Sequence, residues 1–145
     1  MHRRKDRVMS QTLFQAAAGI GRRVEGRALV AKDGFSARYD LDRVRGVFSR
    51  PTHKLSGESY MGRVLILDAA KGGVATAWML YEMKARGIVP AALVLNAVNP
   101  IMVQGAVFAD FTMISGFDLD ITEAIASGTM VEVEPTGEHP FIRII

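Results

Sequence analysis

The sequence predicts an α/β protein in which a small barrel-like sheet system is flanked by two or three helices. Two apolar, β-branched runs in the middle of the chain enclose a helical pattern, and together they indicate a β-α-β unit. An alternating run, a turn and a second extended run end the chain, which is typical of a hairpin. The other strands are short and irregularly spaced. A doubly wound sheet is therefore not favoured, because that fold needs regular alternation of strand and helix.

The β-α-β unit organises the chain and carries its central helix. Ala77, Leu80 and Met83 recur at helical spacing, and Gly87 and Pro90 end the pattern. Trp78 lies on the same helix and is expected to pack into the core, with a place in an interface as the alternative. The expected strands cover residues 24–31, 44–48, 63–67, 91–96, 112–115, 129–134 and 139–145, and the expected helices cover residues 74–85, 97–109 and a short turn at 121–126. In the second helix Asn99 is expected to cap, Pro100 to occupy the first position, and Ile101, Ala106 and Val107 to face inward.

The turn between the first strand and the central helix is the first candidate site. It contains Lys71, Gly72 and Gly73, and backbone N–H groups at Gly72, Gly73 and Val74 are expected to be free at the helix N-terminus. Such an end attracts an anion, and Lys71 adds a neighbouring cation. The turn lacks both the G-x-x-x-x-G-K-[ST] pattern and the G-x-G-x-x-G pattern. A tight structural turn that needs small residues is the alternative interpretation.

Composition limits the classes of function. The chain has 145 residues, about half of them hydrophobic, which suits one domain with its own core. It has no Cys, so it provides no disulfide, no thiolate nucleophile and no cysteine-based metal or iron–sulfur site. Four of the 18 basic residues and one of the 15 acidic residues lie in residues 1–10, which leaves a body with 14 of each. A neutral body argues against a nucleic-acid face.

The domain organisation follows from these patterns. Residues 1–21 are expected to be a flexible basic segment, and residues 22–145 are expected to form the folded domain. Around Leu13 and Phe14 the first segment is expected to form a short helix, or to stay loose until a partner covers these side chains. No apolar run is long enough to span a bilayer, and no signal-peptide pattern follows the basic residues, so a cytoplasmic protein is expected.

The irregular stretch over residues 32–62 is the second candidate site. It carries Arg38, Tyr39, Asp40, Arg50, Thr52 and His53 close together in sequence. A loop region this long in a compact domain is usually functional or covered by a partner, and a polar surface loop is the alternative. A lone His such as His53 is more often structural or exposed than catalytic, and both roles stay open for it here. His2 and His139 offer no obvious second ligand, so no metal site is expected from this chain alone.

Taken together, these features resemble the small, swivelling-domain subunit of the aconitase X enzymes over about residues 24–133. Order and spacing match in the strand VEGRALVA, then GESYMGRVLIL, the turn DAAKGG, the stretch RGIVPAALVLN, the helix NPIMVQGAVFAD and the terminal SGTMVEVE. The resemblance implies a swivelling β/β/α domain that works with a large subunit, and an iron–sulfur cluster that the cysteines of the large subunit hold. The absence of Cys here agrees with that division.

The resemblance also implies dehydration of a small hydroxy acid. Family substrates are cis-3-hydroxy-L-proline, which gives pyrroline-2-carboxylate, and mevalonate 5-phosphate, which gives its anhydro product. The run SRPTHKL is closer to the bacterial hydroxyproline branch, so cis-3-hydroxy-L-proline is the expected substrate. Mevalonate 5-phosphate is the first alternative, with Arg38, Arg50 and Lys71 as phosphate ligands. A non-catalytic binding or scaffold domain is the second.

One departure from the family affects the catalytic assignment. The family turn often reads G-K-G-S and its Ser is the proposed proton acceptor, whereas Gly73 occupies that place here. Ser36, His53 and Thr76, or a residue of the partner, are the candidates to replace it. The substrate-binding residues expected on this basis are Arg50, Thr52, Lys71, Gly72, Gly73 and Val74.

Overall fold

The computed structural model describes residues 12–70 and 74–145. Its strands are β1 (Leu13–Gln15), β2 (Ala18–Ile20), β3 (Val24–Val30), β4 (Gly34–Phe35), β5 (Leu41–Asp42), β6 (Val47–Phe48), β7 (Val64–Ala70), β8 (Ala92–Ala97), β9 (Met113–Ser115), β10 (Met130–Glu134) and β11 (Phe141–Ile144). Its helices are α2 (Val74–Arg86), α3 (Pro100–Phe108) and α4 (Ile121–Ala124). The expected α/β class is confirmed.

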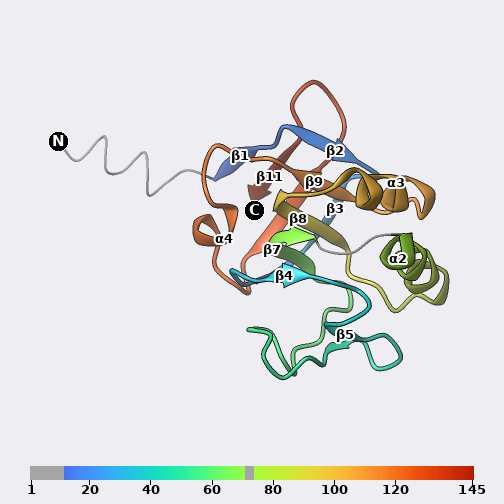
Figure 1. The fold of residues 1–145 in the computed structure, drawn as a ribbon. Coiled ribbons are helices and arrows are strands. Elements are labelled where there is room, and N and C mark those ends of the chain that lie inside the picture. Colours follow the sequence, from blue (N-terminus) through green and yellow to red (C-terminus); the bar gives the residue numbers. More distant parts are fainter. Residues whose placement is uncertain (1–11, 71–73) are drawn as a thin grey trace.

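The main sheet curls until its two edges nearly meet. Its strands follow the order β1-β11-β10-β3-β7-β8-β9-β2, so β1 and β2 lie at opposite ends of the path. Only Ala16 and Ala17 separate these two strands in the chain, and two residues bridge no more than about 11 Å. The sheet must therefore close on itself, and Figure 1 shows β1 running into β2 across the top of the molecule. This is the expected barrel-like system.

The central strands are buried on both faces and divide the core in two. Along β7, Leu65 and Leu67 face the helices, where they join Leu80 and Met83 of α2. The alternate residues of β7 face the barrel interior and pack with strands β8 to β11 and with α4. Parallel pairing of β7 with β3, β4 and β8 agrees with this double burial, because parallel strands are normally covered on both sides.

The two long helices lie side by side on one face of the barrel (Figure 1). α2 buries Thr76, Leu80 and Met83, and it begins after β7 as the β-α-β pattern predicts. In α3 the Asn99 side chain accepts the Met102 backbone N–H at 2.9 Å, with Pro100 at the start, which confirms the predicted cap.

The predicted inward face of α3 is partly wrong. Met102, Gly105 and Ala106 are buried, whereas Ile101 and Val107 are exposed. Gly105 faces Ala77 of α2 closely enough that a Cβ on Gly105 would lie 2.4 Å from the Ala77 Cβ. The face that turns inward is therefore set by the close crossing of two small residues.

Residues 32–62 form more than a surface loop. They contain β4, β5 and β6, and they bury Phe35, Phe48 and Tyr60 in the helix-side core. The interpretation as a polar surface loop is wrong for these side chains. The segment forms an excursion below the barrel, which Figure 1 shows around β5.

The N-terminal stretch also differs from expectation. Residues 13–20 form β1 and β2 in place of a helix or a loose segment, and they pair with β11 and β9. Phe14 is buried by the domain itself. The sheet therefore starts ahead of the boundary expected at residue 22, while residues 1–11 lie outside the described chain. In the part of the chain that the structure describes, no helix combines the length and apolar character needed to cross a membrane.

Candidate functional site

The strongest candidate site lies where parallel strands end and helices begin. β7 ends at Ala70 and α2 begins at Val74, while β8 ends at Ala97 and α3 begins at Pro100. β4 pairs in parallel with β7, and its last residue, Phe35, lies opposite Ala70. Three carboxyl ends of strands and two helix N-termini thus converge on one edge. In sheets with parallel strands this edge is where ligands bind.

The predicted glycine turn falls at this edge. Lys71, Gly72 and Gly73 lie outside the described residues, so nothing in the structure bears on their amides. Val74, the first residue of α2, is 62% exposed. Thr76 in the same turn of the helix is buried.

Ser36 follows β4 directly and closes a short turn with Asp40. The Asp40 carboxylate accepts the Ser36 backbone N–H at 3.0 Å, and the Ser36 carbonyl accepts the Asp40 backbone N–H at 2.9 Å. The Ser36 Oγ accepts the Tyr39 N–H at 3.3 Å, which is at the long end of the hydrogen-bond range. Ser36 is thus held by its backbone, and its hydroxyl is only weakly engaged.

Arg50 joins the acidic residues of this segment to each other. Its Nε donates to Asp40 Oδ1 at 2.5 Å, its Nη1 donates to Thr52 Oγ1 at 2.7 Å, and its Nη2 lies 3.6 Å from Asp33 Oδ1. The Asp40 side chain is 5% exposed and that of Arg50 is 36% exposed. We call Asp33, Asp40, Arg50 and Thr52 the Arg50 cluster. The sequence pattern identified Asp40, Arg50 and Thr52 as candidate site residues, but it did not identify Asp33.

Electrostatics in the Arg50 cluster favour its charged forms. The hydrogen bond to Asp40 is the main cause that raises the pKa of Arg50. Burial pushes the pKa of Asp33 upward, but hydrogen bonds from the backbone N–H groups of Lys54 and Gly34, together with the charge of Arg50, outweigh it. The pKa of Asp33 is therefore lowered. Both groups stay charged at neutral pH.

His53 is held by backbone groups on both sides of its ring. Its Nδ1 accepts the Leu55 N–H at 3.0 Å, so the ring is protonated at Nε2, which donates to the Gly34 carbonyl at 2.8 Å. The residue is 3% exposed, and its ring packs on Phe48 with the centroids 4.6 Å apart. With both nitrogens engaged inside the domain, this geometry supports the structural interpretation of His53 and leaves it no free nitrogen to accept a substrate proton.

A second polar cluster at the same edge was missed by sequence reasoning. Asn96 donates to Asp68 Oδ1 at 3.0 Å and to Asp120 Oδ1 at 2.8 Å, and its own oxygen accepts the Ile121 N–H at 2.9 Å. Lys32 pairs with Asp120 at 3.0 Å. We call Lys32, Asp68, Asn96 and Asp120 the Asn96 cluster. The sequence held one signal for it, because Asp68 and Asn96 are polar residues that each follow a Leu at the end of an apolar run. The structure pairs these two leucines in register, which brings the polar residues together.

The Asn96 cluster holds the Asp120 carboxylate in the ionised form. A hydrogen bond from the Thr122 hydroxyl is the main cause that lowers the pKa of Asp120, and the amide of Asn96 adds to it. Burial opposes both, and Lys32 adds a further lowering. The pKa of Asp120 lies well below its ordinary value. The cluster therefore joins β7, β8 and α4 through charged contacts.

The described residues offer no set of ligands for a metal ion. The sequence has no Cys, and residues 12–70 and 74–145 contain no group of three or more His, Asp or Glu side chains placed to hold an ion. These residues do not fit an iron–sulfur cluster.

Comparisons with known proteins agree in pointing to one family. A family model described as the aconitase X swivel domain matches residues 13–142. The phosphomevalonate dehydratase small subunit of Methanopyrus kandleri is 33% identical over 115 residues, which cover 79% of this chain and 85% of the relative. The protein of the same name from Pyrococcus abyssi is 28% identical over 126 residues, which cover 86% of this chain and 95% of the relative.

Solved structures share the fold. A chain of the Thermococcus kodakaraensis aconitase X crystal structure (holo-form) superposes with a TM-score of 0.83 at 20% identity, covering 93% of this chain and 99% of the other. The solution NMR structure of a UPF0107 protein gives a TM-score of 0.79 at 27% identity and covers 92% of this chain and 98% of the other. The superpositions therefore span nearly the full length of both solved chains.

Proposed function

The chain belongs to the aconitase X swivel-domain family, and we propose from this premise that it is the small subunit of a two-subunit dehydratase. Its substrate is a small hydroxy acid, for which cis-3-hydroxy-L-proline is our first choice. The observation that carries the assignment of the site is the shared edge at which β4, β7 and β8 end and α2 and α3 begin. The large subunit supplies the iron–sulfur cluster and closes this edge.

The role of this chain is to hold the substrate. The carboxylate binds at the N-terminus of α2, where the helix dipole and free N–H groups attract an anion. Lys71, Gly72, Gly73 and Val74 are the residues proposed to form this cradle. A donor that stabilises charge developing in the transition state is typically worth about 3 kcal/mol of barrier.

Among the candidate proton acceptors we rank Ser36 first. It follows β4 at the shared edge, and among the described residues its hydroxyl receives one long hydrogen bond, from the Tyr39 N–H. Thr76 ranks second, since it is buried in the first turn of α2. His53 ranks last because both ring nitrogens bond to the backbone. We propose that His53 and the Arg50 cluster shape the wall of the pocket and position the loop that carries Ser36.

Arg50 is the feature that favours the hydroxyproline substrate. A phosphate dianion is normally held by cations with uncommitted donors. Arg50 Nε and Nη1 donate to Asp40 and Thr52 of its own domain, and its Nη2 lies 3.6 Å from Asp33, so two of its five N–H groups are engaged in these hydrogen bonds. A substrate with only a carboxylate to bind does not need donors from Arg50. Mevalonate 5-phosphate is the second candidate, and the names of the curated relatives favour it.

Reconstitution with the large subunit of the same organism tests the proposal. We expect the complex to convert cis-3-hydroxy-L-proline with a kcat/KM at least 100-fold above that for mevalonate 5-phosphate. The reverse ratio would select the second candidate. A stable complex that turns over neither substrate would support the non-catalytic binding domain. Ser36→Ala should lower kcat strongly in the same assay. Thr76→Val removes the hydroxyl of the second-ranked candidate, and a larger loss of kcat in that variant would reverse the ranking.

A further inference from the structure

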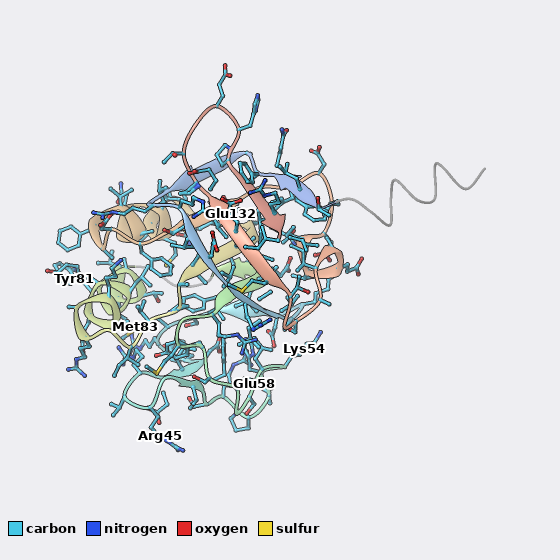
Figure 2. All side chains as sticks on the ribbon, turned by 180° about the vertical axis from the view of Figure 1, so that it is seen from behind. Arg45, Lys54, Glu58, Tyr81, Met83 and Glu132 are labelled. Carbon is cyan, nitrogen blue, oxygen red and sulfur yellow. The ribbon has the colours of Figure 1, made fainter. Side chains whose placement is uncertain are left out.

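The two long helices leave a group of large apolar side chains uncovered. Trp78 is 58% exposed, which corrects the expectation that it packs into the core, and Phe108 is 61% exposed. The Trp78, Tyr81 and Phe108 rings contact each other, with centroid distances of 6.1, 5.3 and 4.9 Å. Figure 2 shows Tyr81 projecting outward from α2. We call this surface the α2–α3 patch, made of Val74, Trp78, Tyr81, Ile101 and Phe108.

The patch surrounds a groove between the helices. The groove has a volume of about 230 Å³, and Ala77 and Gly105 line it together with residues of the patch. Ala77 and Gly105 let the helix backbones approach closely, while the large rings of Trp78 and Phe108 stand beside them. Small residues at the helix crossing and aromatic residues beside it create a slot of a size that accepts a side chain. Aromatic residues around such pockets are typical of interface hot spots.

The chemistry of the groove selects its partner. Among the residues that the structure describes, those that line the groove include no charged side chain, and Gln104 is the polar one. The nearby charges are already engaged, because Arg86 pairs with Glu82 at 3.0 Å and Lys84 donates to the Asp110 carbonyl at 2.9 Å. Phosphate backbones and anionic lipid surfaces need free cations. The patch therefore fits an apolar protein surface, since contiguous exposed apolar groups of this kind mark interaction sites.

We propose that the α2–α3 patch is the docking surface for the large subunit, an inference that rests on the proposed function. The patch is continuous with the candidate site, because Val74 opens α2 and Ile101 lies in the first turn of α3. A body seated in the groove also covers the shared edge. A second copy of this chain in the same place would cover the site without completing it, because it has no Cys to hold a cluster.

The chain offers a direct probe of this docking, because Trp78 is its only Trp. We would replace it biosynthetically with 5-fluorotryptophan and add the unlabelled large subunit of the same organism. The expected result is that the ¹⁹F resonance loses its H₂O/D₂O solvent shift when the complex forms. A resonance that keeps this shift in the assembled complex would overturn the proposal. The same loss in the isolated chain at rising concentration would assign the patch to self-association and would also overturn it.

Two substitutions measure the contribution of the patch to binding. Trp78→Glu and Phe108→Glu should each raise the Kd for the large subunit at least tenfold, whereas Val44→Glu, at a side chain that is 73% exposed on the β5–β6 segment, should change it less than twofold. Unchanged binding by both patch variants, with folding verified by circular dichroism, would overturn the proposal. Binding is measured without substrate. A complex that protects Trp78 but converts neither substrate would uphold the docking surface and reject the proposed activity, and no complex at all would reject both.

Discussion

Asp40 is a carboxylate that the protein buries and then neutralises with a single cation. Its side chain is 5% exposed, and Arg50 provides the charge that compensates this burial. Glu132 of β10 is also buried, and two cations neutralise it: Arg23 donates to its Oε2, and Arg143 donates to its Oε1 at 2.5 Å. Figure 2 places Glu132 over the strands of the sheet, away from α2. At the residue scale, buried carboxylates are stable here because each has a guanidinium partner.

Arg50→Ala should lower the free energy of unfolding by about 1–3 kcal/mol. The variant leaves the buried Asp40 carboxylate without its cation, and such an unpaired charge is costly. Urea denaturation at pH 7 measures the change. Arg45→Ala is the control, because Arg45 is exposed and points away from the domain in Figure 2. Equal midpoints for the two variants would show that the cluster does not stabilise the fold.

Glu132→Gln should change how stability depends on pH. The hydrogen bond from Arg23 is the main cause that lowers the pKa of Glu132 below its ordinary value of 4.5. The stabilisation that ionised Glu132 gives the folded state is therefore complete above pH 4.5, and it is lost as the pH falls through the lowered pKa of Glu132. We expect the wild type to lose stability below about pH 4.5, and the variant to lose less over the same window while being about 1.5–3 kcal/mol less stable at pH 7.

The test is a series of urea melts between pH 3 and pH 7. Glu138→Gln changes an exposed carboxylate in the hairpin turn and serves as the control. Parallel curves for wild type and Glu132→Gln would contradict the assignment of acid sensitivity to this group.

At the scale of elements, the arrangement of the helices is determined by what they pack against. Both helices cover the same face of the barrel and cross at Ala77 and Gly105. This crossing decides which side of α3 is buried, and it leaves Ile101 and Val107 exposed, with Ile101 in the α2–α3 patch. Helical spacing alone did not distinguish these faces, because α3 carries apolar residues on nearly every side.

Gly105→Val should separate the two helices and destabilise the protein by about 1–3 kcal/mol. A Cβ at this position would lie 2.4 Å from the Ala77 Cβ and 2.8 Å from its Cα, and both atoms belong to a packed helix. Thermal melts measure the loss. The Ala77→Gly/Gly105→Ala double variant, which removes the shorter of the two contacts, should be more stable than Gly105→Ala alone. A Gly105→Val protein as stable as the wild type would show that the crossing is not tight.

At the scale of the whole molecule, barrel closure depends on the first strands. β1 pairs with β11 and β2 pairs with β9, so eight residues join the two ends of the sheet. Phe14 fills part of the barrel interior from this position. A chain that starts after β2 would leave β9 and β11 as unpaired edges, and such edges favour aggregation.

Deleting residues 1–21 should lower the free energy of unfolding by more than about 3 kcal/mol, because burial of Phe14 alone is worth about 1.5–3 kcal/mol and two pairs of strands are lost with it. Differential scanning fluorimetry and light scattering measure stability and aggregation. A chain that starts at Thr12 is run alongside it, which separates the contribution of residues 12–21 from that of residues 1–11. Equal stability of the two shortened chains would contradict a role for β1 and β2 in closure.

The sequence by itself determined the β-α-β unit, the capped helix at Asn99, the terminal hairpin and the family. These features are local, because each depends on the spacing of apolar residues or on the conformational preference of a few neighbours. Periodicity therefore located β7, α2 and β8 to within a few residues. Composition alone likewise excluded a cysteine-held cluster in this chain, because the sequence has no Cys.

Only the tertiary structure decided which strands close the barrel, which groups bond to the ring nitrogens of His53, and that Trp78 is exposed. Each depends on groups that are distant in sequence: β11 and β9 recruit residues 13–20, Gly34 and Leu55 occupy the His53 ring, and Gly105 meets Ala77 beside Trp78. Short strands carry too weak a pattern to identify their partners, because pairing is stabilised by neighbours and not by the strand itself. The Asn96 cluster was missed for a related reason, because its members come from two strands and the start of a helix that are distant in sequence.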